Sequence, residues 1–311
     1  MKIVIAIGGN SIINGENSVS STSEQYNQIT ETCRNLVKIL NNNDEIVITH
    51  GNGPQVGYLL RMSEKAKDEI PLFPLDYCVA NTQGAIGYHL QMALNKVMQE
   101  EGIKKEAVTI ITQVVVSRDD PAFENPTKPI GAFFTEEEII KHAKMYGWKY
   151  INDSGRGYRR VVPSPKPISI IEINCIRTLI DNNFVVIACG GGGIPVVKKN
   201  GEYVGCEAVI DKDAASALLA ISLNADLFII STAVDHAYIN YKKEGEEMIK
   251  EIKVSKLREY LDKGHFEKGS MEPKVKACIK FTESTGKRSV ITSPSNIYNS
   301  VKGMGGTQII L

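Results

Sequence analysis

The chain has 311 residues, in which 36 Lys and Arg balance 36 Asp and Glu, and 42% of the residues are hydrophobic. This composition is typical of a globular protein with a large core, and the neutral charge balance argues against a surface built to bind nucleic acid. We therefore expect no nucleic-acid partner. No apolar run approaches the roughly 18 residues that a membrane span requires, so we also expect no membrane partner.

The six cysteines are scattered, without a C-x-x-C pair, and most have apolar neighbours. This pattern is typical of buried thiols in a reducing compartment. The apolar start of the chain is too short for the hydrophobic region of a signal peptide, and it is typical of a first strand. We therefore expect a cytoplasmic protein.

Short apolar runs followed by Gly-rich or Ser/Thr-rich turns recur along the chain, at Lys2–Ile7, Glu45–Thr49, Phe184–Cys189, Asp226–Ser231 and Ser289–Thr292. Near-continuous apolar strands of this length indicate a sheet that is buried on both faces. Between them the spacing predicts amphipathic helices: one capped by Ser23, one opened by Pro54 and running to about residue 67, and one over residues 212–223. The predicted fold class is α/β, with three layers around a mainly parallel open sheet.

Residues 119–168 depart from this rhythm, because they carry six prolines and Trp148, the only tryptophan of the chain. A long interruption of this kind is typical of an excursion from the sheet. The sequence therefore predicts a small protruding lid over a site.

Three of the apolar runs end in glycine turns, at residues 8–10, 51–53 and 190–193. One such turn is weak evidence, because tight turns need glycine, but three at one sheet edge favour a phosphate or nucleotide site. The common phosphate-loop, dinucleotide, protein-kinase and hydrolase signatures are absent, and the five histidines lack metal-ligand spacing. His50 lies next to the second turn, where a structural role is favoured over ligand contact.

Three lysines have unusual settings. Lys128 stands between two prolines in the excursion, Lys212 is flanked by Asp211 and Asp213 at a predicted helix start, and Lys274 is predicted to open a further helix, which ends near residue 280. Taken singly, each fits a solvated surface lysine. A cation at a helix N-terminus is disfavoured by the macrodipole, so two such cases suggest a compensating anion.

With these residues assembled, the chain resembles the carbamate kinases of the amino-acid kinase superfamily along nearly its whole length. The matching blocks lie at residues 2–10, 49–57, 126–131, 155–165, 190–196, 209–213, 269–271, 273–275 and 306–307. Two of them lie in the excursion, which looks like the protruding subdomain that separates carbamate kinases from other kinases of the superfamily. Two residues depart from the family pattern. Ser11 stands where alanine is common, and Glu272 places an acidic side chain beside Lys274.

The resemblance implies a single amino-acid kinase domain over residues 1–311. It would have a carbamate-binding half at about 1–183, a nucleotide-binding half at about 184–311 and a lid at about 119–168. It further implies reversible phosphoryl transfer between ATP and carbamate, with Mg²⁺ held mainly by the nucleotide phosphates. The usual net direction in the family is ATP synthesis from carbamoyl phosphate during the breakdown of arginine, as in the arginine deiminase pathway, or of related nitrogen compounds. The family is typically homodimeric.

The same resemblance implies site roles. Lys128, Lys212, Lys274 and Asp211 would be catalytic, with Asp211 orienting Lys212 and Lys274 by ion pairing. Substrate would bind at Gly8, Gly9, Asn10, Gly51, Asn52 and Gly53, and nucleotide at Gly190, Gly191, Ala233, Asp235, Tyr241 and Met271.

Because carbamate is already an anion, the reaction needs no general base, and catalysis would rest on positioning and cationic stabilisation.

Three alternatives to this function stay open. The first is another superfamily kinase, acting on acetylglutamate, aspartate or isopentenyl phosphate, against which the excursion with Lys128 argues. The second is a nucleotide-binding regulatory protein without turnover, against which Asp211 and Lys212 argue. The third is a surface or scaffold role, for which the sequence offers no anchor or repetitive motif.

Overall fold

The computed structural model describes residues 1–8, 21–40, 44–153 and 157–311. Its helices are α1 (Thr22–Val37), α2 (Gln55–Lys65), α3 (Leu75–Glu100), α4 (Glu136–Tyr146), α5 (Ile173–Asp181), α6 (Lys212–Ser222), α7 (Val254–Asp262), α8 (Met271–Thr285) and α9 (Ile297–Val301). Its strands are β1 (Lys2–Ile7), β2 (Glu45–His50), β3 (Ala107–Thr109), β4 (Gln113–Val116), β5 (Lys128–Phe134), β6 (Lys149–Asn152), β7 (Tyr158–Val162), β8 (Pro167–Ile170), β9 (Val185–Ile187), β10 (Ile194–Lys199), β11 (Glu202–Gly205), β12 (Leu227–Ser231), β13 (Ala237–Ile239), β14 (Glu247–Ile249), β15 (Glu251–Lys253), β16 (Ser289–Thr292) and β17 (Thr307–Ile310).

The main sheet has the strand order β15-β17-β16-β12-β1-β2-β9-β3. Every neighbouring pair in it is parallel except β16 and β17. The five strands predicted from the sequence correspond to β16, β12, β1, β2 and β9, which are consecutive in this sheet. The predicted fold class is therefore confirmed.

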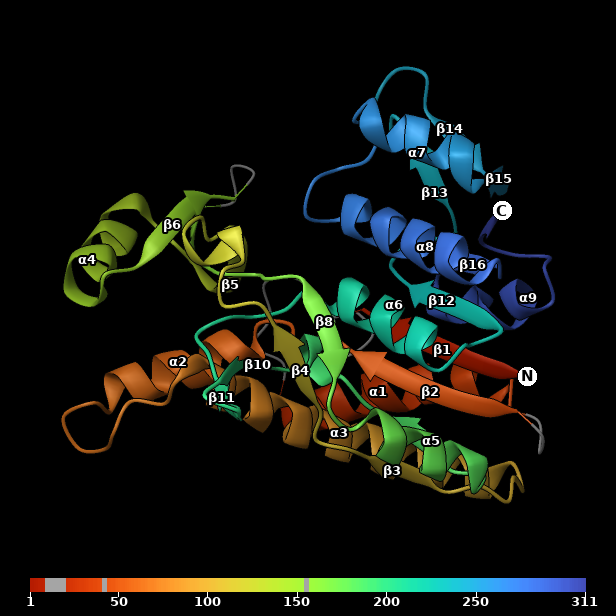
Figure 1. The fold of residues 1–311 in the computed structure, drawn as a ribbon, viewed down its shortest axis with the longest axis horizontal. Helices are drawn as coiled ribbons and strands as arrows, with labels where there is room; N and C mark the ends of the chain where they lie inside the picture. The colour runs from red at the N-terminus through yellow and green to blue at the C-terminus, as the bar shows by residue number, and fades with distance from the viewer. Residues whose placement is uncertain (9–20, 41–43, 154–156) are drawn as a thin grey trace.

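Alternate residues of the strands feed two separate cores, as the period of a strand requires. Ile3 and Ile5 of β1 pack on one face with helices α1 and α3. Val4 and Ala6 of the same strand pack on the opposite face with helices α6 and α8. Helices on both faces of the sheet make the three layers of the fold (Figure 1).

Three predicted helix starts shift by a few residues. The N-cap of α1 is Ser21 and not Ser23, because Ser21 and Glu24 form a reciprocal capping box there. Pro54 is the residue before the first helical position of α2. Helix α8 begins at Met271 and runs to Thr285, so Lys274 lies within its first turns and does not open it.

The lid is a three-stranded antiparallel sheet of order β5-β7-β6 together with α4. In Figure 1 it stands apart from the main sheet, beyond one end of the molecule's body. Its aromatic cluster is built around Trp148, whose ring stacks on that of His142 at a centroid distance of 4.8 Å, with the Arg160 guanidinium 4.9 Å from the indole. The protruding lid predicted from residues 119–168 is therefore present.

The lid is joined to α2 by a backbone-to-backbone contact between Gly57 and Gly131. A Cβ atom added to Gly57 would lie only 2.1 Å from Gly131 Cα. Further along, the Arg61 guanidinium lies 5.5 Å from the Phe134 ring, and Arg160 Nη1 lies 3.1 Å from a Glu64 carboxylate oxygen. Strand β5 thus runs alongside α2 in the same direction.

Two strands that follow residue 184 pair with strands that precede it. Strand β9 pairs with β2 and β3. Strand β10 pairs with β4 in a second sheet of order β11-β10-β4-β8. These pairings join the two parts of the chain, and the division into two binding halves at about residues 183 and 184 stays a prediction.

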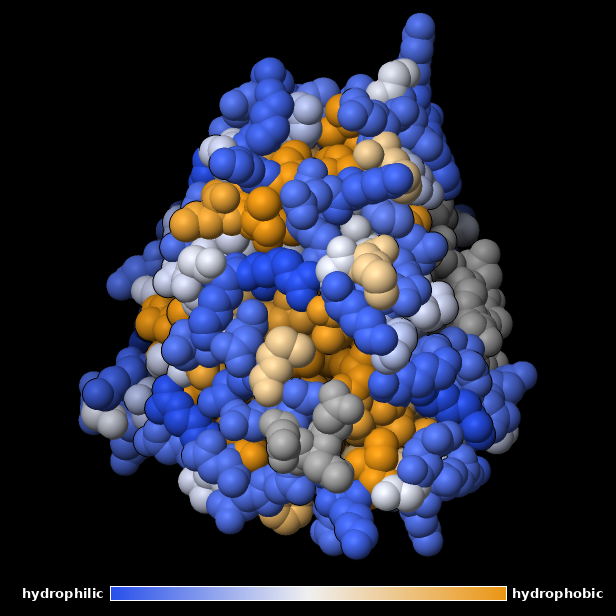
Figure 2. Space-filling model, turned by 90° about the vertical axis from the view of Figure 1, so that its right-hand side faces the viewer, coloured by the Kyte–Doolittle hydropathy of each residue, from blue (hydrophilic) through white to orange (hydrophobic). Residues whose placement is uncertain are grey.

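No helix in the described part of the chain is long and apolar enough to cross a membrane. Figure 2 shows the side of the molecule near the two chain ends, where hydrophobic residues lie in several groups between hydrophilic ones.

Substitution Gly57→Ala tests the contact that seats the lid. The new methyl group would meet backbone, which cannot rotate away, so we expect the lid to shift and turnover to fall by at least about tenfold. Fluorescence of Trp148 reports the shift, because this single tryptophan lies inside the lid.

The matched control is Gly84→Ala in α3, where an added Cβ meets nothing within 4 Å. This substitution should leave fluorescence and turnover unchanged and slightly raise stability, because alanine favours a helix. Normal turnover in the Gly57→Ala protein would contradict the seating role.

Candidate active site

The candidate site lies where the carboxyl ends of β1, β2 and β12 meet. Gly8 follows β1, and a Cβ added to it would lie 3.2 Å from the carbonyl oxygen of Ser231 at the end of β12. At the end of β2, Thr49 Oγ1 lies 2.6 Å from Ser216 Oγ of α6. Parallel strands bring their ends to one edge, and these contacts fix the α6 start at that edge.

Asp213 holds two lysines together in the interior of this edge. It is 3% exposed, and its two carboxylate oxygens lie 2.8 Å from Lys212 Nζ and 3.2 Å from Lys274 Nζ. This corrects the expectation that Asp211 orients the two lysines. The reason is helical geometry, because Asp211 is the N-cap of α6 and accepts hydrogen bonds from the backbone N–H groups of Asp213 and Ala214.

The charges of this cluster shift its pKa values in a consistent way. Burial alone would raise the pKa of Asp213, but the Lys212 and Lys274 ammonium groups outweigh it and hold that pKa well below its usual value. Burial lowers the pKa of Lys212, against the attraction of Asp213. Although it is close to Asp213, Lys212 Nζ has no well-aligned hydrogen-bond acceptor among the described residues. Its N–H groups are therefore available to an anionic ligand.

Lys128 reaches the same place from the lid. Its Nζ lies 2.6 Å from Asp211 Oδ2, so the carboxylate that caps α6 also holds the lid lysine. Burial would raise the pKa of Asp211, but Lys128 outweighs it and the pKa stays below its usual value. Three lysines thus face two aspartates, which leaves one net positive charge at the site.

The Gly190–Gly193 turn separates the loop after β2 from the start of α6. A Cβ on Gly190 would lie 2.3 Å from His50 Nε2, and one on Gly191 would lie 2.7 Å from Asn52 Nδ2. A Cβ on Gly192 would lie 2.3 Å from the carbonyl oxygen of residue 210. Only glycine allows this approach. The turn therefore lies with the predicted carbamate residues, although Gly190 and Gly191 were predicted to bind nucleotide.

The loop after β2 presents buried polar groups that have no partner. Asn52 is 9% exposed, and its Nδ2 makes no hydrogen bond to any described residue. The same holds for both side-chain amide atoms of Gln55 and for Ser231 Oγ. Buried polar atoms are normally hydrogen-bonded, so a group of unpartnered ones at one edge indicates a ligand site.

The predicted nucleotide residues lie in the C-terminal part. Asp235 accepts a hydrogen bond from Ser293 Oγ, which ties the loop after β12 to the loop after β16. The Tyr241 ring lies 5.5 Å from that of Tyr238, and Met271 opens the helix that carries Lys274. Ala233 is exposed in the loop after β12.

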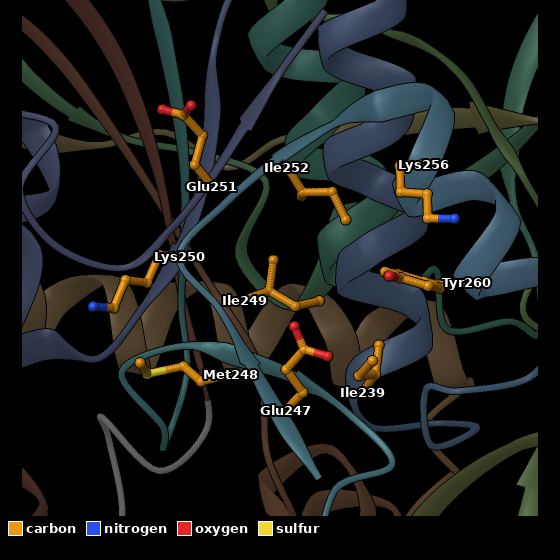
Figure 3. Close-up of a pocket in the computed structure, with 9 residues that line it drawn as sticks. All are labelled: Ile239, Glu247, Met248, Ile249, Lys250, Glu251, Ile252, Lys256 and Tyr260. Atoms are coloured by element: carbon orange, nitrogen blue, oxygen red, sulfur yellow. The ribbon is translucent and has the colours of Figure 1, made fainter. Parts of the chain in front are cut away.

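None of these predicted residues lines the pocket of about 410 Å³ between the β13–β14 hairpin, β15 and α7. In Figure 3 Ile249 and Ile252 lie near the middle of the view, and Ile239 lies beside Tyr260.

Gly9 and Asn10 lie outside the described residues. Gly51 and Gly53 flank Asn52, and Gly53 has a positive φ of 43°. The sequence interpretation missed Asp213, Gln55 and Ser231 as site residues. The D-K-D spacing placed Asp213 beside Lys212, but only the structure shows which of the two aspartates faces both lysines.

The amino acid kinase family model matches residues 1–293 of the chain. A carbamate kinase of Staphylococcus epidermidis is 49% identical over 99% of both chains, and one of Pyrococcus furiosus is 45% identical over 99% of both. The structure of carbamate kinase from Giardia lamblia bound to AMP-PNP superposes with a TM-score of 0.91 and 42% identity, covering 99% of this chain and 98% of that one.

The fold and the family model thus define an amino acid kinase. Within that family the chain belongs to the carbamate kinases.

Substitution Asp213→Asn tests the central ion pairs. Two buried ammonium groups would then face each other without a counter-charge, so we expect the free energy of unfolding to fall by about 3–5 kcal/mol in urea titrations. The control is Glu259→Gln, which breaks an exposed pair with Lys256 and should cause no measurable loss. A fully stable Asp213→Asn protein would refute this role.

His50 should make stability depend on pH. Burial, aided by Lys212, lowers its pKa to about 4, while it stays near 6.5 in the unfolded chain, so the folded state binds fewer protons between these values. The stabilisation is complete above pH 6.5 and is lost as the pH falls towards 4, by about 3 kcal/mol in total. Urea unfolding at pH 7 and pH 4.5 should show this loss, and His50→Asn should remove it. An identical pH slope in the variant would show that other groups carry it.

Proposed function

We propose that the protein catalyses reversible phosphoryl transfer between ATP and carbamate, which gives ADP and carbamoyl phosphate. The observation that carries the proposal is the buried Lys212–Asp213–Lys274 cluster at the edge where Asn52 is unpartnered. The relatives named above carry the name carbamate kinase, which agrees with this proposal.

Phosphoryl transfer of this kind requires the protein to position the two substrates and to stabilise negative charge. A carbamate oxygen attacks the γ-phosphorus as the bond to the β-phosphate oxygen breaks, and no proton has to move. Lys212 and Lys274 would offset the charge of the β- and γ-phosphates, and Lys128 would reach the oxygens of carbamate or the phosphoryl group. Gly8 and the loop at residues 51–53 would bind the transferring group and the carbamate.

Asp211 and Asp213 have different roles in this proposal. Asp213 holds Lys212 and Lys274 at a fixed separation, and Asp211 holds Lys128 until the substrate's oxygens compete for it. The lid thereby delivers a cation to the reacting atoms only when it is seated on α2.

Magnesium fits this donor set as a companion of the nucleotide. The described residues contain no group of three or more His, Cys, Asp or Glu that could hold a metal ion, and both aspartates of the site already pair with lysines. Mg²⁺ is commonly bound through substrate phosphates, waters and one or two carboxylates. Bound in this way, it would neutralise phosphate charge, with Asp211 or Asp213 as its nearest protein carboxylates.

We further propose that the enzyme works in the cytoplasm, towards ATP synthesis during arginine breakdown, and as a homodimer. The free state of all six cysteines supports a reducing compartment. A dimer is supported by exposed Tyr77, Tyr88 and Met92 on α3, which leave apolar surface available to a second copy.

The proposed reaction is tested by ATP formation from carbamoyl phosphate and MgADP in a coupled assay, with acetyl phosphate as the comparison substrate. Lys128→Ala, Lys212→Ala and Lys274→Ala should each lower kcat by about 10²–10⁴, the range for lost transition-state cations. Lys287→Ala, which removes an exposed pair with Asp226, is the control and should have no effect. Near wild-type kcat in Lys212→Ala would exclude its catalytic role.

A further inference from the structure

We propose that Gln55 recognises the amino group of the substrate and makes the enzyme select carbamate over carboxylates that lack one. This inference rests on the proposed function and adds to it the residue that sets specificity. It starts from the buried amide of Gln55, whose Nε2 and Oε1 both lack a hydrogen-bond partner among the described residues.

The position of Gln55 places this amide at the loop after β2. Gln55 is the first residue of α2, and its backbone N–H donates to the carbonyl oxygen of Asn52 at 3.0 Å. Its side chain folds back on the loop, since a Cβ on Gly53 would lie 2.7 Å from Gln55 Oε1. The amide therefore lies against the loop that also presents the unpartnered Asn52 Nδ2.

The lid approaches the same helix end. Strand β5 runs alongside α2 in the same direction, with Gly131 on Gly57 and Phe134 beside Arg61. Lys128 lies three residues before Gly131 along β5, in the direction of the N-terminal end of α2, and its Nζ lies 2.6 Å from Asp211 Oδ2. In the proposed complex, the substrate would lie between Lys128 and the loop after β2, where it would meet the amide of Gln55.

The other polar side chains of the site are mostly donors, whereas an amino group needs an acceptor, which Gln55 can supply. Lys128, Lys212, Lys274 and Asn52 Nδ2 are all donors, which suit oxygen atoms. Asp213 Oδ1 is a second unpartnered acceptor, but it lies 2.8 Å from the Lys212 ammonium. Ser231 Oγ is also unpartnered and can accept, but it stands alone at the end of β12. Gln55 offers a neutral acceptor beside a donor on one side chain, at the loop after β2.

A carbamate presents one edge with an N–H group beside a carbonyl-type oxygen, as a primary amide does. The amide of Gln55 presents the complementary edge, an acceptor beside a donor, and both of its atoms are available. Two hydrogen bonds would form, and the second carbamate oxygen would face the phosphoryl group. Acetate puts a methyl group where the N–H would be, which leaves Oε1 buried and unpaired, and such sites discriminate strongly.

The test compares two substrates in the direction of ATP synthesis, with MgADP and either carbamoyl phosphate or acetyl phosphate. In Gln55→Met, a variant of similar length without the amide, the ratio of the two kcat/KM values should fall at least tenfold. The fall should come from carbamoyl phosphate, with acetyl phosphate unchanged or improved. Gln99→Met, at an exposed position near the end of α3, is the control and should keep the wild-type ratio.

Gln55→Asn keeps the polar group but shortens its reach, so it should lose the same selectivity and serves where Gln55→Met fails to fold. Retained ADP binding and Trp148 fluorescence show that each variant is folded. Two results in folded variants of a selective wild-type enzyme would overturn this inference alone. In the first, the ratio of the two kcat/KM values stays at its wild-type value. In the second, activity falls equally with carbamoyl phosphate and with acetyl phosphate. A wild-type protein that makes no ATP from carbamoyl phosphate would overturn the proposed function and this inference together.

Discussion

One buried carboxylate sets the charge arrangement of the whole site. Two ammonium groups repel each other strongly in a low-dielectric interior, and Asp213 lets Lys212 and Lys274 come together there. The α6 start must therefore lie close to the first turns of α8. The Gly190–Gly193 turn places α6 there by close backbone approach, and the Thr49–Ser216 contact does so by a hydrogen bond between two hydroxyl groups, without further charges.

The lid adds a third cation to the site without burying another charge in the protein interior. Lys128 pairs with Asp211 at the rim, where both side chains are partly exposed, so it can exchange a carboxylate for a phosphoryl oxygen at little expense. The Gly57–Gly131 contact fixes where β5 meets α2, and stacking of the Trp148 and His142 rings packs the interior of the lid.

The sequence was sufficient for the main sheet, because each of its five predicted strands is a short apolar run that alternates between two cores. It was also sufficient for the three lysines, because prolines and helix starts marked them as unusual. It could not assign Asp213, since Asp211 and Asp213 flank Lys212 equally and only the N-cap geometry of α6 separates them. Gln55 was missed because an unpaired amide is a property of packing, which the sequence does not show. The order of the strands in the sheet was not predicted either, because pairing between distant strands leaves no local sequence pattern.

The central position of β1 has a consequence for how the chain folds during synthesis. Its residue Ile3 pairs with Ile46 of β2 on one side and with Leu227 of β12 on the other. One edge of this apolar strand therefore stays unpaired until most of the chain has been synthesised. Until β12 emerges from the ribosome, the nascent sheet exposes an unpaired hydrophobic edge, which is a template for association with other chains. The pairing of β1 with β12 is a non-local contact, and contacts of this kind slow folding.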